Sequence, residues 1–305
     1  MNGRRVLVTG GAGFIGANLA NHLSETNEVI ALDDCYLGTP ANLDDGVEFV
    51  EASVLDDGLP TDVDIVFHLA ALSSYAMHEE DPCRGARVNV EGFVNVVEQV
   101  LGADCETIVY ASTSSIYGTR TEPSGEELTV AANTAYEASK LARERYSEYF
   151  SNHYDLSACG LRLFSVYQGY DGTEGHKGTY ANVIAQFADD VANGRSPVLY
   201  GDGTQTRDFT HVSDVVRSFE LAADKQLDGI YNVGTGARYS FNTVVEMVND
   251  ELGTDVSPEY IENPIDESVY VHDTHADPSK LHDETGWKPK IDFEEGIRRV
   301  CEAYR

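Results

Sequence analysis

A glycine-rich turn near the N-terminus restricts the possible folds of this chain more than any other feature of its sequence. A β-prone run at residues 5–9 continues directly into Gly10-Gly11-Ala12-Gly13-Phe14-Ile15-Gly16, and residues 14–23 then have the apolar spacing of a helix. In such a strand–turn–helix unit, glycines permit a tight turn and let the backbone approach a pyrophosphate at the helix N-terminus. A glycine-rich turn can also be purely structural, but its position here predicts a dinucleotide site. The residues expected against the dinucleotide are Gly10, Gly13, Phe14, Ile15 and Gly16.

Strand and helix patterns alternate over the first two-thirds of the chain, which favours an α/β fold built on a doubly wound parallel sheet. The run VDIVFHLAA at 63–71 is almost continuously apolar, as expected for a strand buried on both faces. Residues 156–167 are expected to form another strand. The predicted helices include 83–101, 135–154, 180–193, 211–223, 241–252, 277–286 and 293–304. We expect a nucleotide-binding domain at 1–167, with returning segments near 205–235. Residues 168–305 are expected to form mainly a smaller C-terminal α/β substrate lobe, interleaved with that domain.

The second predicted strand ends in two carboxylates, Asp33 and Asp34, the first of them 17 residues after Gly16. A carboxylate at this place accepts hydrogen bonds from the adenosine ribose and repels a 2′-phosphate. The neighbouring sequence holds no Arg or Lys that would attract that phosphate. The strand end therefore predicts NAD rather than NADP as the cofactor.

A phenol and an ammonium lie four residues apart at Tyr136 and Lys140, hence on one face of the predicted helix 135–154. Such a pair can also be a surface tyrosine packed over a lysine stem. A strand upstream ends in hydroxyl residues that include Thr113. A nearby ammonium and an oxidised nicotinamide would both lower the pKa of the phenol, so that Tyr136 could act as a base.

These features occur together with further motifs, in a fixed order along the chain. The motifs are Gly10/Gly13/Gly16, Asp33, His68-Leu69-Ala70-Ala71, Asn89, Ser112-Thr113-Ser114, Tyr117-Gly118, Tyr136/Lys140, Leu161-Arg162 and Arg207-Asp208-Phe209-Thr210-His211-Val212. In this series the chain resembles an extended short-chain dehydrogenase/reductase of the nucleotide-sugar epimerase/dehydratase family, from its first strand to its last helix. The resemblance implies a Rossmann fold that binds NAD and a nucleotide sugar.

The resemblance also implies roles for individual residues. Thr113, Tyr136 and Lys140 match the catalytic positions, and Lys140 would also hold the nicotinamide ribose. The remaining positions implied on the cofactor side are Asp34, Ser53, Val54, Leu69, Ala70, Ala71 and Asn89. The positions implied for the substrate are Ser114, Ser165, Lys177, Leu199, Tyr200, Arg207 and Asp266. The helices 83–101 and 135–154 match those that form a homodimer interface in the family.

Three substrate-side and cofactor-side positions depart from the family pattern. Ser165 stands where an Asn is usual, and Ser53 stands where many members have an adenine-binding Asp. Asn263-Pro264-Ile265-Asp266 replaces a motif that supplies a second arginine for the diphosphate. Arg207 is then the one arginine implied to grip the nucleotide diphosphate, through a charge-assisted contact.

The resemblance leaves a choice of reaction. A 4,6-dehydratase is disfavoured, because Ser114 and Ser115 replace the Asp-Glu pair that follows the Thr in those enzymes. We expect a UDP-glucose/UDP-galactose or UDP-hexosamine 4-epimerase that works through a 4-keto intermediate. One alternative is an ADP-heptose 6-epimerase-like enzyme that uses Lys177, because residues 174–181 resemble a stretch of those enzymes. Another is a catalytically inactive protein that senses NAD.

The charge of the chain excludes other classes of function. The formal net charge is −31, which repels nucleic acid and anionic membranes, so neither is an expected partner. Self-repulsion on this scale suggests a halophile's protein that needs molar salt. The five cysteines show no metal-binding spacing, and no metal is expected. The N-terminus shows no apolar segment typical of a signal peptide, so a cytoplasmic location is expected.

Overall fold

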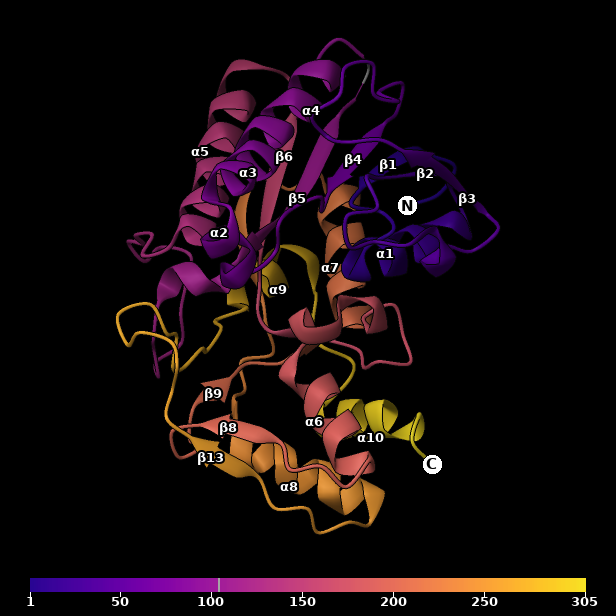
Figure 1. The fold of residues 1–305 in the computed structure, drawn as a ribbon. Coiled ribbons are helices and arrows are strands. Elements are labelled where there is room, and N and C mark those ends of the chain that lie inside the picture. Colours follow the sequence, from indigo (N-terminus) through magenta and orange to yellow (C-terminus); the bar gives the residue numbers. More distant parts are fainter. Residues whose placement is uncertain (104) are drawn as a thin grey trace.

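The computed structural model describes residues 1–103 and 105–305, and a parallel sheet of seven strands forms its centre (Figure 1). The strand order is β11-β6-β5-β4-β1-β2-β3. The sheet therefore grows from β1 to β2 and β3 on one side, and from β4 to β5, β6 and β11 on the other. The strands are β1 (Arg5–Thr9), β2 (Glu28–Asp33), β3 (Val47–Glu51), β4 (Ile65–His68), β5 (Thr107–Thr113), β6 (Ser157–Leu163) and β11 (Gly229–Val233). Ligands bind where the strand order reverses, which here lies beyond the carboxyl ends of β1 and β4.

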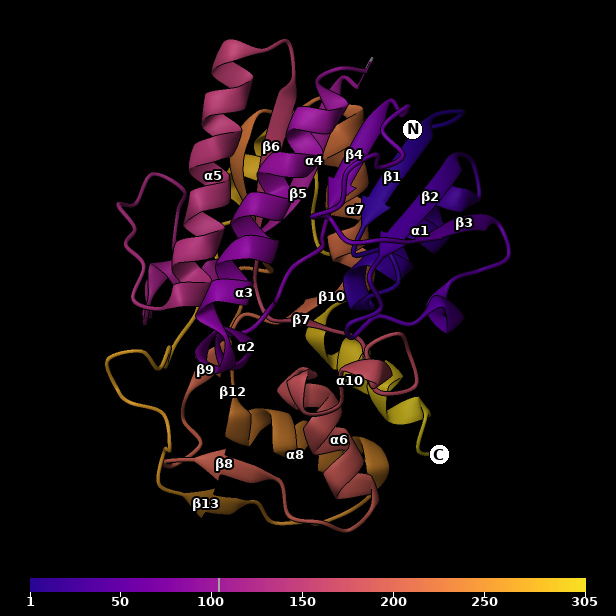
Figure 2. The same cartoon turned by 45° about the horizontal axis from the view of Figure 1, so that its top comes forward.

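Helices cover both faces of this sheet. On one face lie α1 (Phe14–Ser24), α7 (Val212–Asp224) and α9 (Ser279–Thr285), and on the other α2 (Tyr75–Glu80), α3 (Pro82–Ala86), α4 (Gly92–Val100) and α5 (Ala135–His153) (Figures 1 and 2). Alternate residues of one strand enter different cores: Val6 and Val8 join the core around α1 and α7, whereas Leu7 joins the core around α4. This two-sided burial accounts for the continuous apolar strands and confirms the predicted α/β, Rossmann-type fold.

The remaining elements form a smaller lobe beyond the carboxyl ends of the strands (Figure 1). It consists of α6 (Val183–Ala192), α8 (Phe241–Leu252), α10 (Phe293–Glu302) and the parallel pair β8 (Val198–Tyr200) and β13 (Glu259–Ile261). Its own core contains Ile184, Val244 and Ile297, all fully buried. Two short pairs lie between the lobe and the sheet: β7 (Val166–Tyr167) with β10 (Thr210–His211), and β9 (Thr206–Arg207) with β12 (Tyr239–Ser240).

Two predicted elements are interrupted in the structure. The helix expected at 83–101 contains a π-helical turn at Arg87–Glu91, where the carbonyl of Asn89 accepts a hydrogen bond from Arg143 Nε. Such turns are often found at functional sites. The strand expected at 156–167 is broken at Ser165, whose φ of +28° lies outside the strand region. The break turns the chain from β6 in the sheet to β7 near the lobe.

No helix in the described residues is long and apolar enough to cross a membrane. Within residues 1–103 and 105–305, no three side chains of the His, Cys, Asp and Glu types gather in a way that could hold a metal ion.

Candidate active site

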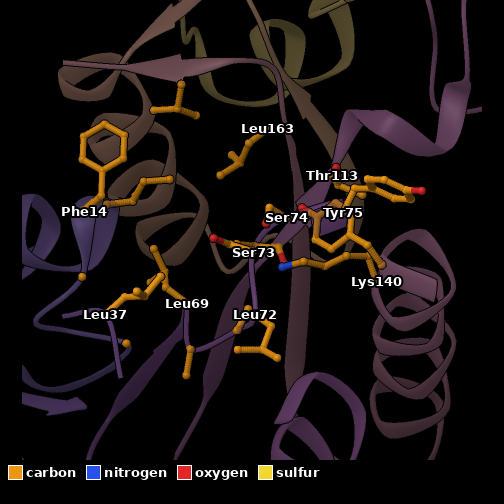
Figure 3. Close-up of a pocket in the computed structure, with 18 of the residues that line it drawn as sticks. Phe14, Leu37, Leu69, Leu72, Ser73, Ser74, Tyr75, Thr113, Lys140 and Leu163 are labelled. Carbon is orange, nitrogen blue, oxygen red and sulfur yellow. The ribbon is translucent and has the colours of Figure 1, made fainter. Parts of the chain in front are cut away.

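A cavity of about 520 Å³ lies between the carboxyl ends of the strands and the lobe. Figure 3 shows Phe14 and Leu37 on one side of it and Thr113 and Lys140 on the other, with Ser73 and Ser74 between them. The residues predicted from the sequence that line this cavity are Gly10, Gly13, Phe14, Ile15, Gly16, Asp33, Asp34, Val54, Leu69, Ala70, Ala71, Thr113, Ser114, Tyr136, Lys140, Ser165, Lys177 and Arg207. Segments more than 190 residues apart in the chain therefore share one cavity.

The glycine turn is built so that side chains cannot occupy it. Gly10 has a φ of +68°, and a Cβ there would lie 2.6 Å from the backbone nitrogen of Ala70. A Cβ on Gly16 would lie 2.0 Å from the carbonyl oxygen of Gly10. These close approaches open the N-terminus of α1 toward the cavity, and its free N–H groups suit a pyrophosphate.

Asp33 connects the end of β2 to this turn. Its carboxylate accepts hydrogen bonds from the backbone N–H groups of Ala12 (3.1 Å) and Cys35 (2.9 Å). Burial raises the pKa of Asp33, although these two N–H groups act in the opposite direction. The carboxylate thus supports the turn as well as facing the cavity that would hold the adenosine ribose.

In the folded protein an arginine lies near this strand end, although the neighbouring sequence contains no Arg or Lys. Arg84 of α3 lies over the ring of Tyr36, with its guanidinium carbon 3.8 Å from the ring centroid. Both side chains line the cavity next to Asp34. Arg84 is 50 residues later in the chain, so no local pattern could have placed it there.

Thr113, Tyr136 and Lys140 form the opposite wall. Lys140 is buried, and its Nζ donates to the carbonyl of Ala111 (3.1 Å) and lies 5.8 Å from the ring centroid of Tyr136. The ring of Tyr136 meets His78 of α2 edge to face, with centroids 5.4 Å apart. Thr113 Oγ1 lies 3.0 Å from Ser115 Oγ, so hydroxyl groups border the phenol.

In the protein alone, the pKa of Tyr136 moves in the direction opposite to that expected with the cofactor bound. Burial raises the pKa of Tyr136, and the hydrogen bond with Thr113 only partly opposes this effect. Burial, together with the charge of Arg143, holds the pKa of Lys140 well below its usual value. Desolvation is therefore the largest influence on the pKa of each of these two side chains.

The lobe contributes cations to the remaining sides of the cavity. Arg207 Nη1 donates to the carbonyls of Thr206 and His272, each at 2.8 Å, and its guanidinium carbon lies 5.9 Å from the ring centroid of Tyr270. The neighbouring Asp208 is fully buried and accepts N–H groups from two other segments, which holds the Arg207 strand in place.

Lys177 lies on the side of the glycine turn. Its Nζ is 5.5 Å from the ring centroid of Phe14, and burial lowers its pKa. The loop that carries Lys177 is held by the fully buried Glu174, whose carboxylate accepts hydrogen bonds from the backbone N–H groups of Gln168 (2.7 Å) and Asn182 (2.6 Å).

Five predicted site residues do not line the cavity. Asn89 is fully buried and uses its amide on the backbone of Leu72, on His78 and on Ser139. The side chain of Leu199 is fully buried in the core of the lobe.

The other three lie beside the cavity or outside it. Asp266 is exposed, and its carboxylate accepts the N–H and hydroxyl of Ser268, while its neighbour Ile265 lines the cavity. The hydroxyl of Ser53 accepts from the N–H of Leu55 (3.2 Å). Tyr200 is half-buried next to Tyr270, with ring centroids 6.4 Å apart.

Several cavity residues were missed by sequence reasoning. The clearest are Tyr36, Arg84, His176, Tyr270 and the pair Ser73-Ser74. Tyr36 lies two residues after Asp34, so the sequence could have indicated that it borders the same strand end. The others lie on α3, in the segments after β4 and β7, and in the loop before α9, and only packing brings them to the cavity.

Comparison with known proteins agrees with this geometry. The model of the NAD dependent epimerase/dehydratase family matches residues 6–234. A putative UDP-glucose 4-epimerase of Methanocaldococcus jannaschii is 34% identical over 303 residues, which cover 97% of this chain and 96% of that protein.

Two solved structures are similar over nearly the whole chain. UDP-N-acetylglucosamine 4-epimerase from Methanobrevibacter ruminantium, in complex with UDP-N-acetylmuramic acid, has a TM-score of 0.92 at 30% identity, covering 99% of this chain and 98% of that one. UDP-glucose 4-epimerase from Thermus thermophilus, in complex with NAD, has a TM-score of 0.86 at 33% identity, covering 99% of both chains. The chain belongs to the NAD-dependent epimerase/dehydratase family, and its cofactor is NAD.

Proposed function

We propose that this protein is an NAD-dependent 4-epimerase of a nucleotide sugar, with a UDP-hexose such as UDP-glucose/UDP-galactose, or a UDP-hexosamine, as substrate. One observation carries the proposal: Thr113, Tyr136 and Lys140 share a single cavity with the glycine turn and with Arg207. Ser114 and Ser115 stand beside Thr113, so the wall lacks the carboxylates that water elimination would require there. Similarity to UDP-sugar 4-epimerases supports the same reaction.

The residues present fit NAD. The close backbone packing at Gly10 and Gly16 leaves the N-terminus of α1 at the cavity, where it suits the pyrophosphate, and the carboxylate of Asp33 suits the adenosine ribose. Lys140 would hold the nicotinamide ribose. When bound, NAD takes up a hydride from the sugar and returns it, and its positive charge favours ionisation of Tyr136.

The protein's own part in the reaction is proton transfer and orientation. Tyr136 would take the proton of the sugar 4-hydroxyl as that carbon is oxidised to a ketone, and would return it after the ketone is reduced on its other face. Thr113 would hydrogen-bond the same oxygen and so hold it against the phenol. Arg207 would grip the diphosphate, which leaves the sugar free to turn between the two half-reactions.

The proposed function is tested by incubating the purified protein in molar KCl with UDP-glucose, without added NAD, and following the sugar by proton NMR. We expect UDP-galactose to form, because a cofactor regenerated in each cycle has no need to leave. UDP-N-acetylglucosamine and UDP-glucuronate extend the test to other hexoses. Failure with all three, even with NAD added, would contradict the proposal and favour the 6-epimerase alternative or an inactive sensor.

Lys177 separates the proposed reaction from 6-epimerisation. In the rival reaction Lys177 is a second acid/base, whereas its position beside Phe14 favours binding of a phosphate. We expect Lys177→Met to raise the KM of substrate or the Kd of NAD by about 10- to 100-fold, which is the value of a charge-assisted hydrogen bond, with little change in kcat. Lys177→Arg should restore most of that affinity. A large fall in kcat at unchanged KM would instead assign Lys177 to the chemistry.

We also propose that the enzyme is adapted to a cytoplasm of high salt. At a net charge of −31, carboxylates repel one another over a Debye length of about 10 Å at 0.1 M salt but only about 3 Å at 1 M. Relief of a few kcal/mol of repulsion corresponds to a rise in Tm of roughly 5–10 °C for a chain of this size. Thermal unfolding from 0.1 to 2 M KCl measures it. A Tm that stays flat or falls would exclude this adaptation.

We propose a homodimer formed through α4 and α5. The outer surface of α5 and its C-terminal end expose Tyr146, Tyr149 and Tyr154, each more than 40% accessible. Exposed aromatic side chains in one place mark a surface for association. Sedimentation velocity in molar KCl should give about twice the chain mass of 33.3 kDa. Tyr149→Asp should shift it to the monomer, whereas Tyr260→Asp, on the exposed lobe strand β13, should not.

A further inference from the structure

Helix α5 carries a second buried cation besides Lys140, and this cation has no role in the reaction as described above. Arg143 lies on α5 three residues after Lys140 and seven after Tyr136, which places all three on one side of the helix. Its side chain is fully buried. Among the residues that the structure describes, none offers it a carboxylate within salt-bridge distance, whereas its neighbour Glu144 is paired with Arg162. A guanidinium buried without a carboxylate is costly, so other interactions must hold it there.

The contacts of Arg143 join the catalytic helix to the wall of the cavity. Nη2 donates to the carbonyl of Ala70 (2.7 Å), and Nε donates to the carbonyl of Asn89. Ala70 is the residue whose backbone nitrogen closes on Gly10 of the glycine turn. Arg143 therefore ties α5 to the loop on which the cofactor must rest.

The second contact extends this connection around Tyr136. The amide of Asn89 binds both backbone groups of Leu72 and also reaches Nε2 of His78 (3.2 Å) and Oγ of Ser139 (2.9 Å). His78 is the ring that meets Tyr136 edge to face. Through Asn89, Arg143 thus reaches both the cavity wall and the ring that supports the phenol.

The titratable groups that face this cluster do not cancel the charge of Arg143. They are His68 from β4, Tyr110 from β5, His78 from α2, and Tyr136, Glu137 and Lys140 from α5. Burial lowers the pKa of both histidines and raises that of Tyr110, so these three are neutral near pH 7. Glu137 is turned to the backbone N–H of Asn133 (2.7 Å).

Arg143 and Lys140 differ in how well they keep their charge. Burial lowers the pKa of Arg143 only to about 10, so it stays charged at neutral pH. The pKa of Lys140 falls well below its usual value, first from burial and then from the charge of Arg143. Arg143 is therefore a permanent cation on the face of α5 that also carries Tyr136.

We propose that Arg143 is a positioning residue for the reaction: it fastens α5 to the Ala70 wall and keeps a permanent positive charge on the helix face that carries Tyr136, which stabilises the phenolate. The proposal rests on the proposed function in so far as Tyr136 is the acid/base. The electrostatic assistance from Arg143 then adds to that of the bound cofactor.

The test reads the ionisation of Tyr136 directly and uses no substrate. Protein labelled with [¹³Cζ]tyrosine is titrated by NMR with saturating NAD, and the resonance lost in Tyr136→Phe identifies Tyr136. We expect Arg143→Met, which removes the charge but keeps an apolar side chain in the buried site, to raise the Tyr136 midpoint by about one pH unit or more. Arg143→Gln is the second neutral variant should Met not fold.

Two controls separate charge from structure. Arg143→Lys keeps the charge but cannot bind both carbonyls, and its midpoint should stay closer to that of the unsubstituted protein. Arg145→Gln removes an exposed charge from the same helix and should leave the midpoint unchanged. Equal midpoints in Arg143→Met or Arg143→Gln and the unsubstituted protein, or no ionisation of Tyr136 in either up to pH 11, would overturn the proposal. Because no turnover is measured, this failure is distinct from a failure of the proposed 4-epimerase activity.

Discussion

Tyr136→Phe is expected to lower kcat for the interconversion of UDP-glucose and UDP-galactose by between roughly 10² and 10⁴-fold, the usual contribution of a positioned acid/base. The substitution removes the hydroxyl that exchanges a proton with the sugar and leaves the ring. The ring retains its edge contact with His78, and Lys140 retains its hydrogen bond to the carbonyl of Ala111. NAD content and Tm should therefore change little.

The matched control is Tyr146→Phe, on the same helix but exposed. It removes the same atom without touching the cavity and should leave kcat as it is. The measurement is the initial rate in molar KCl, together with the NAD content of each purified variant. Full activity in Tyr136→Phe would show that another group acts as the base. A variant that has lost its NAD would show that Tyr136 holds the cofactor rather than the proton.

Glu144→Ala is expected to lower the free energy of unfolding by about 3–5 kcal/mol. Glu144 and Arg162 are 3% and 5% exposed and form a two-point ion pair, at 2.7 Å and 2.9 Å, between α5 and β6. Ser112 of β5 adds a third hydrogen bond to the same carboxylate (2.6 Å). Removing the carboxylate leaves the guanidinium of Arg162 charged and buried, and among the residues that the structure describes its remaining hydrogen-bond partner is the hydroxyl of Tyr117 (2.7 Å).

Replacing both partners distinguishes the cost of an unpaired charge from the value of the pair. Glu144→Met with Arg162→Met should recover most of the lost stability, because an apolar pair of similar volume needs no counter-ion. Denaturant unfolding at one fixed KCl concentration measures all three proteins. A loss below about 1 kcal/mol in Glu144→Ala would mean that water reaches Arg162 and that the pair is not truly buried.

Local patterns determined the elements on which the site is built. The glycine spacing, the apolar strand at 63–71 and the hydroxyl-ended strand before Tyr136 each depend on neighbours within one turn or one strand, where periodicity is informative. The helices expected at 135–154 and 241–252 occur as Ala135–His153 and Phe241–Leu252. Family resemblance then extended these patterns to further residues that line the cavity, among them Ala70, Lys177 and Arg207.

The family resemblance did not predict the direction of two side chains, which point away from the cavity. Asn89 turned inward to the Leu72 backbone, and Leu199 turned into the core of the lobe. A position in a motif specifies the backbone but leaves open which face the side chain takes in a new packing arrangement. Asp266 does not line the cavity for a different reason: its carboxylate, in a loop, accepts hydrogen bonds from the N–H and hydroxyl of the nearby Ser268.

The sequence by itself determined the fold class, the dinucleotide turn and the Tyr136–Lys140 pair, because each rests on contacts between near neighbours in the chain. Tertiary packing alone places Arg84 over Tyr36 at the cavity, Lys177 beside Phe14, and the buried Arg143 against the carbonyl of Ala70. It also decided the direction in which the pKa of Tyr136 moves. These properties depend on desolvation and on charges brought together from distant segments, and the burial of an individual charged or polar side chain has no local signature in an amino-acid sequence.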